Sequence, residues 1–356
     1  MMKLAMPRLY LGTMTFAWSA QTSSVVDEAV ALEMVKRFVK FNEDIGVDTH
    51  RVDTARVYAG GNTEPMVGAV LKQLGPISGT VTVGSKAHPS VKPGLTPAGM
   101  DEQLKVSLDE MKMSSLGEYY LHQPDTDHSL LEALTCADAM VKEGKISSVG
   151  MSNYHASEMA RAFDLCKEHN LTPPTVYQGL YNPLNRMVED ELLPVLKQNG
   201  CSFIAYNPLA AGLLAGKHKG PNEVAKGRFK DNPNYLPRFY TDRNFEALEI
   251  VRKACETEGI TMVEATYRWL LRHSALGEMD GILLGASSLD QLDQNLAACK
   301  AAAEKEGLPS NLLDAFDQAW GLTEEGSFPY WRSYSSDMPE REALDQGASY
   351  NAAKTK

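Results

Sequence analysis

The sequence predicts an α/β protein in which eight parallel strands close into a barrel inside a ring of helices. Its 356 residues are enough for one large domain. Short β-branched or apolar runs alternate with segments of helical period almost from end to end, as in repeated strand–helix units. About eight such runs occur, and eight is the barrel number. The predicted strands are residues 9–14, 47–53, 80–86, 116–121, 146–151, 175–178, 202–206 and 281–284.

Amphipathic helices separate these strands. The clearest has an apolar stripe that runs from Ala31 to Phe41, with charged residues on the opposite face. Helix starts are also signalled, because Ser129-x-x-Glu132 and Thr261-x-x-Glu264 are typical of capping boxes. The strand–helix alternation is therefore supported by both apolar periodicity and capping residues.

Two segments lack apolar periodicity. Residues 212–242 are rich in glycine and proline and predict a long loop between a strand and a helix, and long loops in compact domains are usually functional. After Arg332 the composition becomes polar, so residues 333–356 are expected to form a mobile C-terminal tail. This leaves residues 1–332 as the barrel domain.

Charge and composition exclude several classes of protein. The 46 acidic and 35 basic side chains give a formal charge of -11, which repels phosphate backbones and anionic membranes on average, so no nucleic-acid partner is expected. No signal peptide and no apolar run of bilayer-spanning length is found, so a cytoplasmic protein without a membrane partner is predicted. The five cysteines are far apart and suggest buried small side chains rather than a disulfide framework or a zinc site.

Four titratable side chains fall at successive strand ends, where a parallel barrel places its active site. Asp53 ends the second predicted strand, Tyr58 lies five residues further on, Lys86 ends the third strand and His122 follows the fourth. Taken singly, each is better explained by an ordinary structural role. Taken together, they predict one pocket with complementary acid–base groups.

The chemistry of the four groups is complementary. A phenol with a pKa of about 10 is a poor proton donor at neutral pH unless a nearby cation lowers that pKa. Lys86 could supply the cation, Asp53 could hold the ammonium, and His122 could hydrogen-bond the substrate oxygen.

The surrounding segments share their order and spacing with a known family. Residues 52–58 (VDTARVY), 85–87 (SKA), 120–125 (YLHQPD) and 150–154 (GMSNY) resemble the aldo-keto reductases. Three further segments are similar to its subfamily of aflatoxin-aldehyde and succinic-semialdehyde reductases: 175–182 (TVYQGLYN), 206–217 (YNPLAAGLLAGK) and 287–295 (SSLDQLDQN). The resemblance spans residues 9–332.

The resemblance implies a (β/α)8 TIM barrel that binds NADPH without a Rossmann fold, and the chain has no G-x-G-x-x-G sequence. It implies that Asp53, Tyr58, Lys86 and His122 are the catalytic tetrad, with Tyr58 as the general acid. The implied reaction is the reduction of small-molecule aldehydes, reactive ketones or dicarbonyls to alcohols.

The resemblance also implies the cofactor contacts. Ser152, Asn153 and Gln178 would hydrogen-bond the nicotinamide carboxamide, and Tyr206 would stack on the ring. The other implied positions run from the first strand end to the pyrophosphate and the adenine: Gly12, Thr13, Met14, Asp53, Asn207, Pro208, Leu209, Gly212, Leu213, Leu214, Gly216, Lys217, Gln294 and Asn295.

A phosphate site is expected where the last strand leads into a helix. At Gly285, Ser287 and Ser288, free backbone donors and the helix dipole favour an anion, although Ser288-x-x-Gln291 also fits a capping box. Many members of the family have an arginine for the 2′-phosphate where this chain has Gln291. Arg228 matches a cofactor-contacting arginine of the subfamily and could replace it. NADPH is therefore expected, with NADH as an alternative cofactor.

The substrate-binding residues are expected near residue 332, where the resemblance to the family ends. Residues 328–332 (FPYWR) resemble the subfamily's ending, where an arginine binds substrate carboxylates, so Trp331 and Arg332 are candidate substrate contacts. Tyr235 and Arg238 are further candidates and are equally well explained as solvated loop residues.

Two other classes of protein are alternatives to a reductase. Barrels of this family also serve as cofactor-binding regulatory subunits of channels, with little turnover. A metal-dependent hydrolase would need clustered ligands such as H-x-H, which the histidines do not form, so no metal site is predicted. A homodimer is compatible with the sequence.

Overall fold

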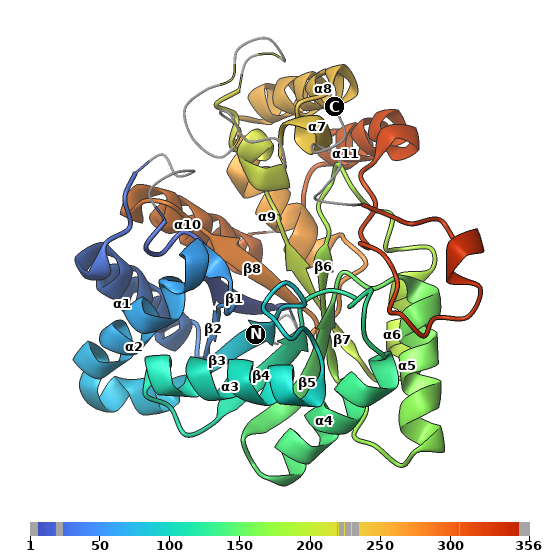
Figure 1. Ribbon diagram of the computed structural model, residues 1–356. Helices are drawn as coiled ribbons and strands as arrows, with labels where there is room; N and C mark the ends of the chain where they lie inside the picture. The colour runs from blue at the N-terminus through green and yellow to red at the C-terminus, as the bar shows by residue number, and fades with distance from the viewer. Residues whose placement is uncertain are drawn as a thin grey trace.

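The computed structural model describes residues 6–18, 24–218, 220, 224, 229, 235–305 and 307–348. Within these residues, eight parallel strands form a closed barrel in the order β1 to β8 (Figure 1). The predicted barrel and all eight predicted strands are thus confirmed. The strands are β1 (Arg8–Gly12), β2 (His50–Asp53), β3 (Val81–Ala87), β4 (Leu116–Leu121), β5 (Ile146–Ser152), β6 (Val176–Leu180), β7 (Ser202–Tyr206) and β8 (Gly281–Gly285).

Helices surround the barrel (Figure 1). The α-helices are α1 (Glu28–Asp44), α2 (Thr63–Leu74), α3 (Pro97–Met111), α4 (Leu130–Lys142), α5 (Ala156–Glu168), α6 (Leu192–Gln198), α7 (Leu236–Phe239), α8 (Asp242–Glu258), α9 (Met262–Arg272), α10 (Leu289–Glu304) and α11 (Ser310–Thr323). Short 3-10 helices are η1 (Tyr58–Gly61), η2 (Gly75–Thr80), η3 (Ala210–Ala215), η4 (Glu324–Gly326) and η5 (Arg341–Ala343). None of the helices in the described ranges is long and apolar enough to cross a membrane.

Apolar burial holds the two layers together. Helix α1 buries Ala31, Met34, Val35 and Phe38 as its sequence pattern predicts, whereas Phe41 is only partly buried. Burial of each of the three larger side chains, Met34, Val35 and Phe38, contributes about 1.5–3 kcal/mol of transfer free energy. Packing of this stripe fixes how α1 lies on the barrel.

Aromatic side chains fill the barrel interior. Tyr10 and Tyr120 pack there with Val176, Ile204 and Leu283. A Cβ atom at Gly150 would lie 2.3 Å from the Tyr120 ring, so glycine is required beside this tyrosine. The register brings Gly12 of β1 level with Asp53 of β2 and with Gly285 of β8, so these strand ends meet at one rim of the barrel.

The segment that follows α11 differs from its predicted form. The sequence predicts a mobile tail from residue 333, but residues 333–348 lie against the barrel, with Tyr334 and Ser335 buried. Ser335 N donates to Glu158 Oε1 of α5 at 2.9 Å, and Ser336 N donates to the carbonyl of Asp125 at 3.1 Å. Apolar periodicity does not predict this segment, because it forms no long helix or strand and is held by individual hydrogen bonds to distant residues. In Figure 1 it descends, in red, beside α5 and α6. Residues 349–356 lie outside the described residues.

The same segment supplies the capping side chain of α4, which the sequence pattern assigns to Ser129. Ser129 makes no side-chain capping bond to α4, in contrast to Thr261, which caps α9 as predicted. Asp337 accepts instead from Leu130 N at 2.9 Å and from Ser129 Oγ at 2.8 Å. It also pairs with Arg161 of α5 at 2.7 Å. Asp337 therefore joins the start of α4 and the middle of α5 to the C-terminal segment.

Candidate active site

A buried ion pair lies at the carboxyl ends of β2 and β3. Lys86 has no exposed surface, and its Nζ donates to Asp53 Oδ1 at 2.8 Å, to Oδ2 at 2.7 Å and to the carbonyl of Thr54 at 2.7 Å. Gln178 Nε2 donates to Asp53 Oδ1 at 2.8 Å. Burial lowers the pKa of Lys86, and the Asp53 carboxylate acts in the opposite direction. The pair is tolerated in the interior because hydrogen bonds satisfy both charges.

Tyr58 lies beside this ion pair. Its hydroxyl is 3.4 Å from Lys86 Nζ, and the ammonium lies 5.1 Å from the centre of the phenol ring. The turn that follows contains Ala59 and Gly60 with φ values of 49° and 66°, a left-handed conformation that is costly for alanine. This strained turn directly follows Tyr58 in the chain.

A second buried carboxylate fixes the loop that carries Tyr58. The fully buried Glu64 accepts from Ser85 Oγ at 2.6 Å and from Arg56 Nη1 at 2.9 Å. Ser85 precedes Lys86 on β3, and Arg56 precedes Tyr58 in the loop. Glu64 therefore links the supports of Lys86 and Tyr58.

His122 follows β4, and its ring lies next to that of Tyr58. The centres of the two rings are 6.0 Å apart with the rings edge to face. Burial lowers the pKa of His122 well below its ordinary value, and the nearby Lys86 and Arg332 act in the same direction. The imidazole is therefore neutral at pH 7. Its Nδ1 is buried with no hydrogen-bond partner among the described residues, which leaves Nε2 for the pocket side.

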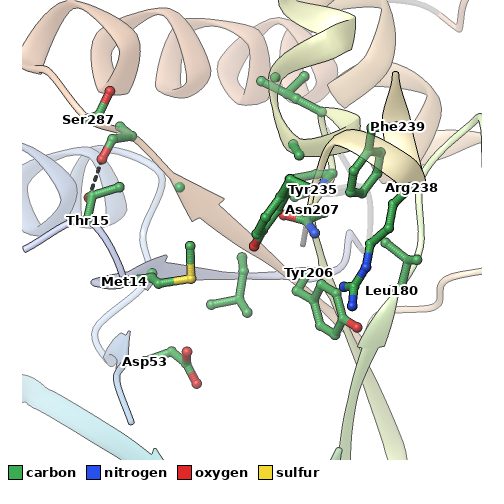
Figure 2. Close-up of a pocket in the computed structure, with 18 of the residues that line it drawn as sticks. Met14, Thr15, Asp53, Leu180, Tyr206, Asn207, Tyr235, Arg238, Phe239 and Ser287 are labelled. Atoms are coloured by element: carbon green, nitrogen blue, oxygen red, sulfur yellow. Dashed lines mark hydrogen bonds between the residues drawn. The ribbon is translucent and has the colours of Figure 1, made fainter. Parts of the chain in front are cut away.

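Asp53, Tyr58, Lys86 and His122 form a tetrad beside a cavity of about 570 Å³. Lys86 lies behind the cavity wall, while Asp53, Tyr58 and His122 line it. Figure 2 shows Met14 and Asp53 on one side of the cavity and Tyr206, Tyr235 and Arg238 on the other. Further predicted cofactor residues that line it are Gly12, Ser152, Asn153, Gln178, Asn207, Pro208, Leu209, Gly212, Lys217, Gly285, Ser287, Gln291, Gln294 and Asn295.

Asn153 ties together the strand ends on the far side of the cavity. Its φ of 64° places it in the left-handed region, which asparagine tolerates better than most residues. Its Nδ2 donates to the carbonyl of His122 at 2.8 Å and to Ser152 Oγ at 2.9 Å, and its Oδ1 accepts from Tyr206 OH at 2.8 Å. The ends of β4, β5 and β7 are thus fixed relative to one another.

The far end of the cavity lies between β8 and α10. Ser287 N donates to Gln291 Oε1 at 2.8 Å, and Ser288 Oγ accepts from Gln291 N at 3.2 Å, so the predicted serine cap is formed. Asn295 Nδ2 donates to the carbonyl of Gly285 at 3.1 Å. Every lining residue between Gly285 and Asn295 is uncharged, so any anion there would meet backbone donors and the α10 dipole.

Several predicted residues do not line the cavity. Thr13 is buried, and its Oγ1 donates to the carbonyl of Asp53 at 2.9 Å, so it supports the end of β2. Trp331 donates from Nε1 to the carbonyl of Asp345 at 3.1 Å and packs edge to face on His155, which turns it towards the C-terminal segment. The other predicted residues outside the lining are Leu213, Leu214, Gly216 and Ser288. Arg228 lies outside the described residues.

The predicted substrate arginine reaches the cavity. Arg332 is 8% exposed and lines the pocket, and its backbone N–H donates to the carbonyl of Asn153 at 3.0 Å. Tyr235 and Arg238 also line the cavity, and the Arg238 guanidinium lies 3.9 Å from the centre of the Phe328 ring. The structure therefore brings these three residues together with the tetrad.

Several residues of the cavity wall were not predicted from the sequence. Trp18, Val57, His88 and Gln123 line it, and each lies in a loop after one of the first four strands. The same strand-end rule that selected the tetrad could have found them, had it been extended by a few residues into each loop. His88 in particular is a titratable residue two positions after Lys86.

The comparisons with known proteins agree with this arrangement. An eight-stranded barrel with a lysine, a carboxylate, a phenol and an imidazole at adjacent strand ends defines an enzyme-like site. Residues 8–309 match the model of the Aldo/keto reductase family, and the chain belongs to that family. The protein is therefore an oxidoreductase by family.

Named relatives cover most of the chain. Aflatoxin B1 aldehyde reductase member 2 of Rattus norvegicus is 38% identical over 295 residues, which are 80% of this chain and 79% of that protein. Aldo-keto reductase family 7 member A3 of Homo sapiens is 39% identical over 293 residues, covering 79% and 87%. Aflatoxin B1 aldehyde reductase member 2 of Mus musculus is 36% identical over 338 residues, covering 92% and 88%.

Proposed function

We propose that the protein reduces aldehydes and reactive ketones or dicarbonyls to alcohols with NADPH. The observation that carries this proposal is the buried Lys86–Asp53 pair beneath the Tyr58 hydroxyl, next to a neutral His122, at one end of an elongated pocket. The names of the relatives, several of which are aldehyde reductases, support aldehydes as the substrate class.

The pocket has features that fit a nicotinamide dinucleotide. Its volume is in the range of ligand pockets, and it runs from the tetrad to the start of α10. The Tyr206 ring lines the pocket and offers an aromatic surface to the nicotinamide. The uncharged lining residues between Gly285 and Asn295 lie at the N-terminus of α10, which favours a phosphate. NADPH bound there would supply the hydride for reduction of the carbonyl carbon.

The tetrad supplies the proton and the orientation of the substrate. Neutral His122 donates a hydrogen bond from Nε2 to the carbonyl oxygen and so polarises it. Tyr58 gives its phenolic proton to the same oxygen as negative charge develops there. The Lys86 ammonium stabilises the phenolate that remains, and Asp53 holds the ammonium in place.

Steady-state turnover tests this proposal. The purified protein is given NADPH with 4-nitrobenzaldehyde, a small dicarbonyl or succinic semialdehyde, without added metal, and loss of NADPH absorbance is followed. We expect turnover of at least one of these carbonyls. No activity with any of them, together with activity restored by a divalent metal, would disprove the mechanism.

Preference for NADPH over NADH is part of the proposal and rests on Arg228. Among the described residues, those that line the pocket between Gly285 and Asn295 include no side-chain cation for a 2′-phosphate, whereas a guanidinium can hold a phosphate with two hydrogen bonds. We expect Arg228→Ala to weaken binding of NADPH more than binding of NADH. Dissociation constants for both cofactors measure this, and equal weakening would assign Arg228 to the shared pyrophosphate or to no cofactor contact.

A further inference from the structure

His88 occupies a fixed position on the pocket wall beside the tetrad. It lines the cavity, and the centre of its ring is 5.0 Å from that of His122, with the rings nearly perpendicular. Its backbone is held from both sides by one buried amide of α3, because His88 N donates to Gln103 Oε1 at 2.9 Å and Gln103 Nε2 donates to the His88 carbonyl at 3.3 Å. The backbone of His88 is therefore held in place at the pocket wall.

The hydrogen bonds of the ring determine what His88 can offer. Ser90 N donates to His88 Nδ1 at 3.1 Å, and Ser90 Oγ lies 2.7 Å from the same nitrogen. A backbone N–H can only donate, so Nδ1 is the acceptor and Nε2 carries the hydrogen of the neutral ring. Burial and the nearby Arg332 lower the pKa of His88 to about 4, so the ring is neutral at pH 7. His88 therefore has a single N–H donor, at Nε2.

The position of the His88 N–H determines which oxygen of a substrate it can bind. His122 is the proposed partner of the reacting carbonyl oxygen, and rings whose centres are 5.0 Å apart can reach two oxygens on neighbouring carbon atoms. The carboxylate of succinic semialdehyde is two methylene groups further from the carbonyl, and Arg332 is the proposed partner of that group. The two recognition positions are thus different.

We propose that His88 is a specificity-determining residue that donates a hydrogen bond to an oxygen on the carbon next to the reacting carbonyl. The inference rests on the proposed carbonyl reduction and adds a substrate feature to it. It favours α-oxygenated aldehydes over aldehydes that have an alkyl group in the same place.

Glycolaldehyde and propionaldehyde form a matched pair of substrates, since a hydroxyl in one replaces a methyl in the other. Values of kcat/KM are measured with NADPH for the wild type, His88→Phe, which keeps a ring and lacks the donor, and His88→Gln, which restores an N–H at the end of the side chain. We expect His88→Phe to lower kcat/KM for glycolaldehyde about tenfold more than for propionaldehyde. We expect His88→Gln to recover most of that difference.

The controls separate this inference from simple packing and from the proposed function. His169→Phe makes the same change at an exposed histidine that follows α5, and it should leave the substrate ratio at its wild-type value. If His88→Phe does not fold, His88→Leu is compared with His88→Gln in the same way. An equal loss for both aldehydes, or a change only in the ratio of succinic semialdehyde to butyraldehyde, overturns the inference while carbonyl reduction stands. A wild-type protein that reduces neither aldehyde overturns both.

Discussion

The two ends of the pocket are built from opposite kinds of side chain. At the tetrad end, an ammonium and a carboxylate are buried together, and a second buried carboxylate, Glu64, braces the loop beside them. At the distal end, between Gly285 and Asn295, the lining consists of backbone, hydroxyl and amide groups only. Proton transfer needs charges held in a place of low dielectric, whereas binding of a phosphate needs only oriented donors.

This difference predicts how the two ends respond to substitution. Changes at the tetrad end should alter kcat or the free energy of unfolding, since each group there holds or moves a charge. Changes at the distal end should alter the dissociation constant of the cofactor and leave kcat near its original value. Substitutions of Tyr58, Asp53 and Gln291 test this division, and a substitution of Arg332 tests the choice of substrate; they follow from the largest expected effect to the smallest.

Tyr58→Phe removes the proposed proton donor and keeps the ring that packs beside Lys86. We expect kcat for 4-nitrobenzaldehyde to fall about 10²- to 10⁴-fold, because the hydroxyl acts on the substrate oxygen in the transition state. The dissociation constant for NADPH, measured by fluorescence titration, should change little. Retained turnover would remove Tyr58 from the role of general acid.

Asp53→Asn leaves the buried Lys86 without its counter-charge. We expect the free energy of unfolding, measured in urea, to fall by about 3–5 kcal/mol, because an uncompensated charge then stays in the interior. The matched control is Asp44→Asn, which breaks the exposed Lys40–Asp44 pair on α1, whose N–O distance is 3.0 Å. That change should cost at most about 0.5 kcal/mol. Similar losses in the two variants would mean that Lys86 is uncharged in the native state.

The sequence predicts those parts of the site that depend on residues close together in the chain, and it does not predict those that depend on contacts between distant residues. The strands and the tetrad were predictable because a polar side chain at the end of an apolar run is visible within a few residues. The cap on α4 was not, since Asp337 lies 208 residues from Ser129, and the local capping box pointed to Ser129 itself. The same holds for residues 333–348, whose anchors on α5 and on the loop after β4 are distant in the sequence.

Arg332 shows how such a distant contact bears on specificity. Its backbone is bonded to Asn153, and the anchored residues 333–348 follow it directly. We expect wild-type protein to prefer succinic semialdehyde over butyraldehyde by roughly ten- to a hundredfold in kcat/KM, since charged hydrogen bonds contribute about 1.5–3 kcal/mol. Arg332→Ala should abolish this preference. An unchanged ratio of the two kcat/KM values would place the guanidinium outside the substrate site.

The smallest effect is expected at the distal end, from Gln291→Arg. Gln291 now accepts hydrogen bonds from Ser287 N and from Ser287 Oγ, the latter at 3.1 Å, so its amide oxygen occupies donors that an anion could use. An arginine at this half-buried position would free those donors and add a cation beside them. We expect the ratio of the NADH to the NADPH dissociation constant to rise by a few-fold to about tenfold. This is less than a buried charged hydrogen bond would give, because solvent screens the site.

Gln291→Ala is the control, since it frees the same donors without adding charge and should change binding of both cofactors alike. If Gln291→Arg leaves the ratio unchanged, or if it lowers kcat as strongly as a tetrad substitution does, the division between a charged catalytic end and a neutral binding end fails.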